Sequence, residues 1–151
     1  MASGGCMCGS VRFELKSDPF DCGWCHCRTC QLYSGAPAMA FACVPTQNFI
    51  WTQGMPGWVE TSSFGQRAFC ADCGTPLQVR VDYQPETVDL PIVTLDDPSA
   101  IVPEFHIFWS SKVDWFNPGD DLPKHEKFRP GTRGLEGTEP PDDSSLSGGG
   151  R

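Results

Sequence analysis

Eight of the nine cysteines of this 151-residue chain fall into three short clusters. The clusters span Cys6 to Cys8, Cys22 to Cys30 and Cys70 to Cys73. Thiolates two or three positions apart on a turn can point at one ion, and tetrahedral zinc takes four such donors at about 2.3 Å, usually from two turns. The spacing therefore indicates metal binding, and it constrains the fold more than any other feature of the chain.

Disulfide bonds account poorly for these cysteines. Their number is odd, and nine in 151 residues is sparser than in secreted disulfide scaffolds, where cysteine exceeds about 8%. Residues 1–5 lack the basic and apolar runs of a secretory signal, and no apolar stretch approaches the ~20 residues that span a bilayer. We therefore expect a cytoplasmic protein with no membrane partner, in which the thiols stay reduced.

The charge of the chain argues against nucleic acid as a partner. Eleven basic and 19 acidic residues give a net charge of -8, and no run of Lys or Arg occurs. Proteins that bind phosphate backbones usually present a basic surface.

Composition divides the chain near residue 135. Residues 135–151 are rich in Gly, Ser, Pro and acidic residues, which predicts a disordered acidic tail. Residues 1–134 have the length of one domain.

Short period-two patterns predict an all-β domain. Apolar and polar residues alternate over 11–15 and 77–81, as in half-buried strands. Further predicted strands cover 39–44, 49–52, 58–63, 67–69, 88–95 and 105–109. Pro91 suggests that the 88–95 strand lies at a sheet edge. The best helical segment is 28–34, ended by Gly35, so we expect short sheets with one or two helical turns.

Spacing alone leaves the ligand sets open. One set is Cys6, Cys8, Cys70 and Cys73, with the middle cluster free for a second ion; the other is a zinc ribbon of Cys27, Cys30, Cys70 and Cys73. A third possibility is a single structural zinc with spare thiols.

The motifs around these cysteines resemble the glutathione-dependent formaldehyde-activating (GFA) enzyme family, which includes the CENP-V-like proteins. They read GCMCGSVRF over 5–13, CHCRTCQ over 25–31 and FCADCGT over 69–75. Downstream, LDDP over 95–98, PEFHI over 103–107 and DLP over 121–123 are similar to the family's later segments. The resemblance covers roughly residues 4–129.

This resemblance implies a β-tent fold that holds two zinc ions. Cys6, Cys8, Cys70 and Cys73 would bind a structural zinc, and Cys25, Cys27 and Cys30 would bind a catalytic one. Three protein ligands leave one tetrahedral position open for water or substrate. The implied activity is that of a carbon–sulfur lyase, which forms S-hydroxymethylglutathione from glutathione and formaldehyde, or acts on a related thiol and aldehyde.

A negatively charged tripeptide that docks on an acidic protein needs local cations. The candidates for substrate binding are Arg28, inside the second cysteine cluster, and Arg67, His106 and Lys112 elsewhere in the chain.

Cys22 leaves the second site ambiguous. It precedes Cys25 by a ligand-like spacing and could close the site with a fourth thiolate. Two arguments favour the open site: four ligands within nine residues would be crowded, and a fourth thiolate would add charge to an acidic protein. A closed site would favour the alternative function, a non-catalytic zinc-stabilised binding module of the same fold.

Overall fold

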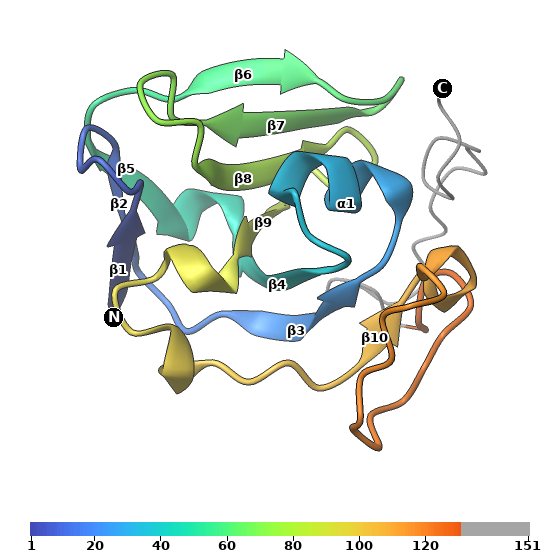
Figure 1. Ribbon diagram of the computed structural model, residues 1–151. Helices are drawn as coiled ribbons and strands as arrows, with labels where there is room; N and C mark the ends of the chain where they lie inside the picture. The colour runs from blue at the N-terminus through green and yellow to red at the C-terminus, as the bar shows by residue number, and fades with distance from the viewer. Residues whose placement is uncertain (131–151) are drawn as a thin grey trace.

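The structure, a computed structural model, describes residues 1–130 and is mostly β (Figure 1). Ten strands form a three-stranded and a seven-stranded sheet, and the described residues contain one short α-helix. The predicted all-β class is therefore confirmed. No helix in this part of the chain is long and apolar enough to cross a membrane.

The small sheet has the order β1-β2-β5, and both pairings are antiparallel. Its strands are β1 (Ala2–Gly5), β2 (Arg12–Leu15) and β5 (Phe49–Gln53). Alternation along β2 buries Phe13 and Leu15 completely and leaves Arg12 and Glu14 partly exposed. The Phe13 ring stacks on Phe49 with 4.6 Å between ring centroids, so this sheet packs its apolar face into the core.

The large sheet has the order β10-β3-β4-β9-β8-β7-β6, and only the pairing of β10 with β3 is parallel. Its strands are β3 (Phe20–Cys25), β4 (Met39–Pro45), β6 (Gly57–Glu60), β7 (Gly65–Phe69), β8 (Pro76–Val81), β9 (Thr87–Pro91) and β10 (His106–Ile107). Strand β4 is buried from Met39 to Val44, because neighbouring strands and the core cover both of its faces.

Each predicted strand has a counterpart, and three end earlier than expected, including 58–63, which ends at Glu60. The 88–95 segment leaves the sheet after Pro91 and continues as a 3₁₀ turn at Ile92–Thr94, and a second 3₁₀ turn at Trp109–Ser111 follows β10. Strands β1 and β3 were not predicted. The sequence of β1, ASGG, has little β propensity, and in β3 Asp21 and Gly23 interrupt the residues that favour strands, so tertiary pairing determines both.

The prediction that Pro91 marks an edge strand is wrong. Strand β9 lies between β4 and β8. Pro91 is tolerated because it is the last residue of β9 and pairs with Phe41 on one side only, whereas β8 meets β9 at Asp89. The missing amide of proline therefore costs no ladder hydrogen bond from β8.

The predicted helix is confirmed as α1 (Arg28–Ser34). Cys27 caps its N-terminus, and Gly35 ends it in the left-handed region at φ 63°, where its amide donates to the Gln31 carbonyl. The helix lies across the face of the large sheet (Figure 1).

The Tyr33 hydroxyl fastens α1 to an irregularity in the sheet. The register of β7 and β8 shifts between Ala68 and Phe69. There the hydroxyl accepts a hydrogen bond from the Leu77 amide (3.0 Å) and donates one to the Ala68 carbonyl (2.5 Å). The side chain thus satisfies backbone groups near the shift.

Buried apolar residues form two clusters. The larger lies between the two sheets and includes Phe13, Leu15 and Leu77. The smaller surrounds Cys25, Cys27 and Cys30 and includes Phe105 and Phe108. The predicted tail at 135–151, and the end of the predicted domain at 134, lie outside the described residues and stay predictions.

We expect Tyr33→Phe to lower the free energy of unfolding by about 1–3 kcal/mol, because it leaves buried backbone groups of Leu77 and Ala68 unpaired. Urea denaturation measures the change, with Leu32→Ala on the exposed side of α1 as the control. An equal effect of the two substitutions would contradict this role for the hydroxyl.

Candidate functional site

Two groups of cysteine sulfurs converge within the described residues. The first group is Cys6, Cys8, Cys70 and Cys73, and the second is Cys25, Cys27 and Cys30. Within each group all ligand atoms lie within 4.8 Å of one another. The structure therefore brings together the two sets that the resemblance implied, and the zinc-ribbon set is split between the two groups.

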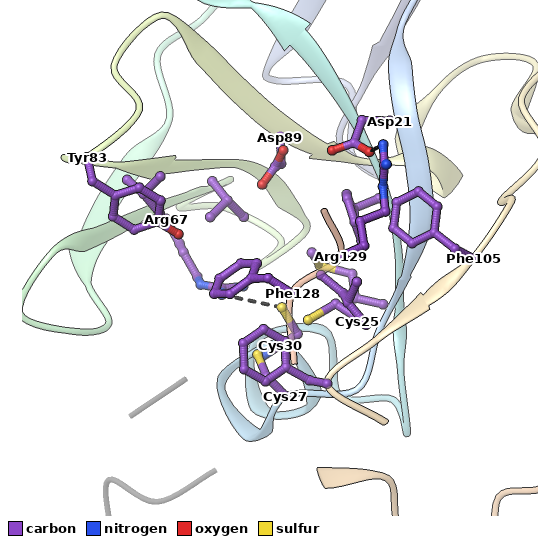
Figure 2. Close-up of a pocket in the computed structure, with 16 residues that line it drawn as sticks. Asp21, Cys25, Cys27, Cys30, Arg67, Tyr83, Asp89, Phe105, Phe128 and Arg129 are labelled. Carbon is purple, nitrogen blue, oxygen red and sulfur yellow. Dashed lines mark hydrogen bonds and ion pairs between the residues drawn. The ribbon is translucent and has the colours of Figure 1, made fainter. Parts of the chain in front are cut away.

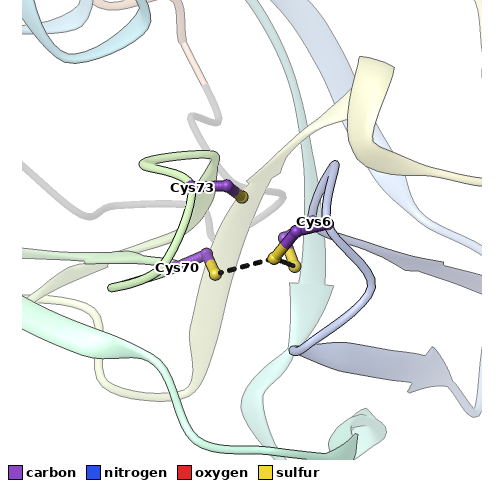
Figure 3. Close-up of side chains that lie close together, drawn as sticks. Cys6, Cys70 and Cys73 are labelled. Carbon is purple, nitrogen blue, oxygen red and sulfur yellow. Dashed lines mark hydrogen bonds between the residues drawn. The ribbon is translucent and has the colours of Figure 1, made fainter.

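The four-sulfur group joins the turn after β1 to the turn after β7 (Figure 3). The sulfurs of Cys6 and Cys8 lie 3.6 Å apart, and those of Cys8 and Cys70 lie 3.7 Å apart. Both turns reverse through a glycine with positive φ, at 80° for Gly9 and 78° for Gly74. These two matched turns fasten the small sheet to the large one.

The three-sulfur group forms where β3 passes into α1. Cys25 is the last residue of β3, and Cys27 caps the helix, its sulfur accepting a hydrogen bond from the Cys30 amide at 3.3 Å. The capped turn directs Cys27 and Cys30 to one point. All three side chains are buried.

The three sulfurs favour one thiolate. Hydrogen bonds from Cys25 and Cys27, together with Arg67, hold the pKa of Cys30 well below its usual range. Hydrogen bonds with Cys27 and Cys30, and then burial, raise the pKa of Cys25 well above it. Neighbouring thiols and the Arg67 guanidinium thus stabilise negative charge in this group.

Arg67 on β7 is the cation of the group. Its side chain is only 5% exposed, and its Nη2 donates to the Cys30 sulfur at 3.4 Å. The guanidinium lies over the Tyr33 ring, 4.8 Å from the ring centroid. Burial lowers the pKa of Arg67, but the sulfurs of Cys30 and Cys27 raise it further, so the guanidinium stays charged.

A cavity of about 60 Å³ opens beside the three sulfurs (Figure 2). Its walls are mainly aromatic and aliphatic side chains, including Phe41, Phe105 and Phe128. The sulfurs lie at one end of the cavity, and Asp21 and Asp89 lie toward the other. An apolar cavity that ends in a few polar groups is typical of a small-molecule site.

Sequence reasoning missed the far end of this cavity. Arg129 forms an ion pair with Asp21, and Phe128 packs edge-on against Phe108, so the segment after β10 supplies part of the wall. Neither Phe128 nor Arg129 belongs to a motif. They are recognised as part of the cavity wall only because the folded chain brings them close to β3.

Two other predicted cations lie outside the cavity lining. Arg28 is exposed at the start of α1 and donates to the Gln31 side chain at 3.4 Å. The Lys112 ammonium donates to the carbonyls of Val113 and Phe116 at 3.0 and 2.9 Å. The structure thus places Arg67 beside the sulfurs, and the substrate roles of Arg28 and Lys112 stay predictions.

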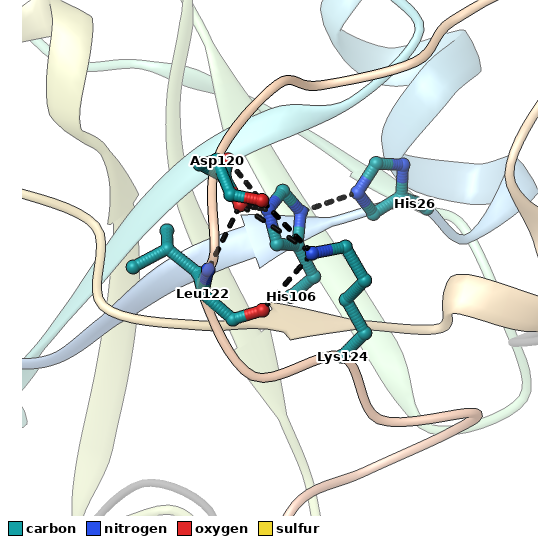
Figure 4. Close-up of polar contacts among 5 residues, drawn as sticks. All are labelled: His26, His106, Asp120, Leu122 and Lys124. Carbon is teal, nitrogen blue, oxygen red and sulfur yellow. Dashed lines mark hydrogen bonds and ion pairs between the residues drawn. The ribbon is translucent and has the colours of Figure 1, made fainter.

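His106 belongs to a separate buried chain of hydrogen bonds (Figure 4). Its Nε2 donates to the Asp120 carboxylate at 3.0 Å, and its Nδ1 lies 2.8 Å from Nε2 of His26. Burial, and then His106, lowers the pKa of His26 to about 4, so this imidazole is neutral at neutral pH. Neither imidazole lines the cavity, and a substrate role for His106 stays a prediction.

Cys22 is not part of the three-sulfur group. Residues three apart on a strand face opposite sides of the sheet, and Cys22 accordingly packs in the core cluster between the sheets, whereas Cys25 packs in the other cluster. Burial and then Glu104 raise the pKa of the Cys22 thiol to about 11.

Comparison with known proteins identifies the family of this chain. Residues 1–111 match the family model of the glutathione-dependent formaldehyde-activating enzymes. The chain belongs to this family. The resemblance predicted from the cysteine motifs is therefore confirmed.

Two curated relatives of this family member are informative. An uncharacterized lyase of Schizosaccharomyces pombe is 32% identical over 74 residues, which cover 49% of this chain and 53% of that protein. The chain thus spans about half the length of this relative. A Halomonas elongata protein whose name places it among the glutathione-dependent formaldehyde-activating enzymes is 27% identical over 127 residues, covering 76% of this chain and 79% of that protein.

A crystal structure of a Rhodobacter sphaeroides protein has a related fold. It is 18% identical, with a TM-score of 0.53, and the match covers 81% of this chain and 98% of that chain. At this identity the likeness concerns the fold alone.

We expect Cys22→Ala to leave the metal content of the purified protein unchanged, because its sulfur lies outside both groups. Elemental analysis of the variant beside the parent measures this. Loss of one ion per chain would contradict the assignment and make Cys22 a ligand.

Proposed function

We propose that this protein is a zinc-dependent carbon–sulfur lyase that interconverts a thiol and an aldehyde with their S-hydroxyalkyl adduct. Glutathione and formaldehyde are the substrates implied by the family. The observation that carries the proposal is the group of three buried sulfurs, Cys25, Cys27 and Cys30, at the end of an apolar cavity. Membership of the family and the name of the S. pombe relative support it.

The donor sets fit zinc. Sulfur separations of 3.6 and 3.7 Å in the four-sulfur group agree with the edge of about 3.8 Å that a tetrahedron with Zn–S bonds of 2.3 Å has. We assign Cys6, Cys8, Cys70 and Cys73 to a structural zinc. The second zinc would be held by the three-sulfur group, whose soft thiolate donors suit this ion.

Zinc held by the three sulfurs would supply the positive charge that keeps a substrate thiol in its reactive thiolate form. Arg67 adds a fixed positive charge beside Cys30, which offsets the negative charge of the sulfurs. The aromatic walls exclude water from the carbon that gains or loses the thiol. These features favour reaction of a bound thiol with a small carbonyl compound.

Docking of glutathione requires a cation at the surface near the sulfurs. Arg28 is suited to this role because it is exposed and directly follows Cys27. Its guanidinium would pair with a substrate carboxylate.

The non-catalytic alternative requires a closed second site. The three-sulfur group contains no fourth His, Cys, Asp or Glu ligand atom from residues 1–130. An open position is the feature that distinguishes catalytic from structural zinc, so the enzyme is the better proposal.

Turnover is tested by exchange NMR with ¹³C-formaldehyde and glutathione, which measures formation of the adduct above the uncatalysed rate. We expect the parent to accelerate exchange. In Cys27→Ser the acceleration should be about 100-fold smaller, because one ligand of the site is missing. Cys22→Ser is the matched control and should keep it. No acceleration by the zinc-loaded parent would overturn the proposed enzyme.

The two sulfur groups should differ in their effect on stability. Cys70→Ser is expected to cost most of the domain's stability, because metal binding at a closed site contributes folding free energy of order ~10 kcal/mol. Cys27→Ser should leave a folded protein. Thermal melts followed by circular dichroism compare them, and equal losses of melting temperature would contradict separate roles.

A further inference from the structure

The Arg67 side chain has one nitrogen without a partner. Its Nε donates to the Thr61 hydroxyl at 3.2 Å and its Nη2 to the Cys30 sulfur at 3.4 Å. Its Nη1 is buried and has no hydrogen-bond partner within residues 1–130. Arg67 also lines the cavity beside the three sulfurs (Figure 2).

An unpaired donor on a buried charged group is costly and therefore uncommon in folded proteins. Guanidinium nitrogens only donate, so the missing partner must be an acceptor. Arg67 lines the cavity that ends at the sulfurs, so an acceptor bound there lies beside this guanidinium. An oxygen atom of a bound small molecule is such an acceptor.

We propose that Arg67 is a catalytic residue whose Nη1 donates a hydrogen bond to the aldehyde oxygen as the carbon–sulfur bond forms. This inference rests on the proposed function and adds the group that stabilises the developing oxyanion. The same guanidinium would contact the sulfur group through Nη2 and the substrate oxygen through Nη1.

The step conserves atoms and electrons. The thiolate sulfur attacks the carbonyl carbon, a carbon–sulfur bond forms, and the π pair of the carbonyl moves to oxygen. The oxygen then takes a proton from solvent, which balances the proton that the thiol released on binding. In the reverse direction the hydroxyl loses its proton, the carbon–sulfur bond breaks, and the pair returns to sulfur.

Arg67 is placed to stabilise the negative charge that develops on the aldehyde oxygen only in the transition state. Contacts with Thr61, Cys30 and the Tyr33 ring fix the guanidinium before substrate binds. A preorganised donor in a site that excludes water stabilises an oxyanion more than a mobile, solvated one does. The other arginine at the cavity, Arg129, is already paired with Asp21.

Arg67→Lys tests the inference, because lysine keeps the positive charge beside Cys30 but loses the two-armed guanidinium. We expect kcat for adduct formation to fall about 100-fold, as for loss of one oxyanion donor, while KM for glutathione changes less than about threefold, because the free thiol carries no aldehyde oxygen. Arg80→Lys is the matched control. Arg80 lies on the neighbouring strand β8, outside the cavity lining, over the Trp58 ring.

Binding provides a readout that does not depend on turnover. Calorimetry compares the affinity for glutathione alone with that for the adduct maintained in excess formaldehyde. The parent should prefer the adduct by at least about tenfold, in line with a hydrogen bond to a charged donor, and Arg67→Lys should lose the preference. A variant that weakens both ligands equally would make Arg67 merely structural and overturn the inference.

NMR of the parent removes any dependence on how the variant folds. The Arg67 Nη1 proton resonance should move downfield on addition of the adduct but not of glutathione alone. An unchanged resonance, or an unchanged kcat in Arg67→Lys, overturns this inference and leaves the proposed function intact. Failure of the parent to accelerate exchange overturns both.

Discussion

Four cysteine sulfurs from two turns join the two sheets of this protein at one point. The turns contribute Cys6 with Cys8 and Cys70 with Cys73, and their sulfurs lie within 4.8 Å of one another. The small sheet has only three strands, and its inner face depends on the core it shares with the large sheet. The junction thus holds the small sheet against the large one, whose β3 also contributes to the second sulfur group.

The second group depends on a local change of structure. Strand β3 ends at Cys25, and α1 begins directly after Cys27, so one short segment passes from a strand to a capped helix turn. That passage turns three sulfurs toward a cavity while His26, between them, joins a separate network with His106. Tyr33 on the same helix holds it to the sheet and also packs against Arg67. Helix α1 therefore both stabilises the fold and arranges the residues of the site.

Much of this could be predicted from the sequence, and the reasons are local. The helix has a cap and a glycine stop, and the strand at 77–81 alternates clearly. The cysteine motifs were specific enough to indicate a family resemblance, and both sulfur groups were predicted from that resemblance.

Other features depend on contacts between distant segments. Strands β1 and β3 carry weak patterns, and β9 is internal although it contains Pro91. Arg67 was one of four candidate cations, and only the pairing of β7 with β8 under α1 places it beside Cys30. The cavity wall formed by Phe128 and Arg129 has no sequence signal.

The central claim is that the three-sulfur group is an open zinc site that takes a thiol. X-ray absorption at the zinc edge of the fully loaded protein counts its sulfur neighbours. Seven cysteine sulfurs shared by two ions predict an average of 3.5 sulfurs per zinc, rising to about 4 when glutathione fills the open position. An average of four before glutathione, unchanged by its addition, would contradict the claim.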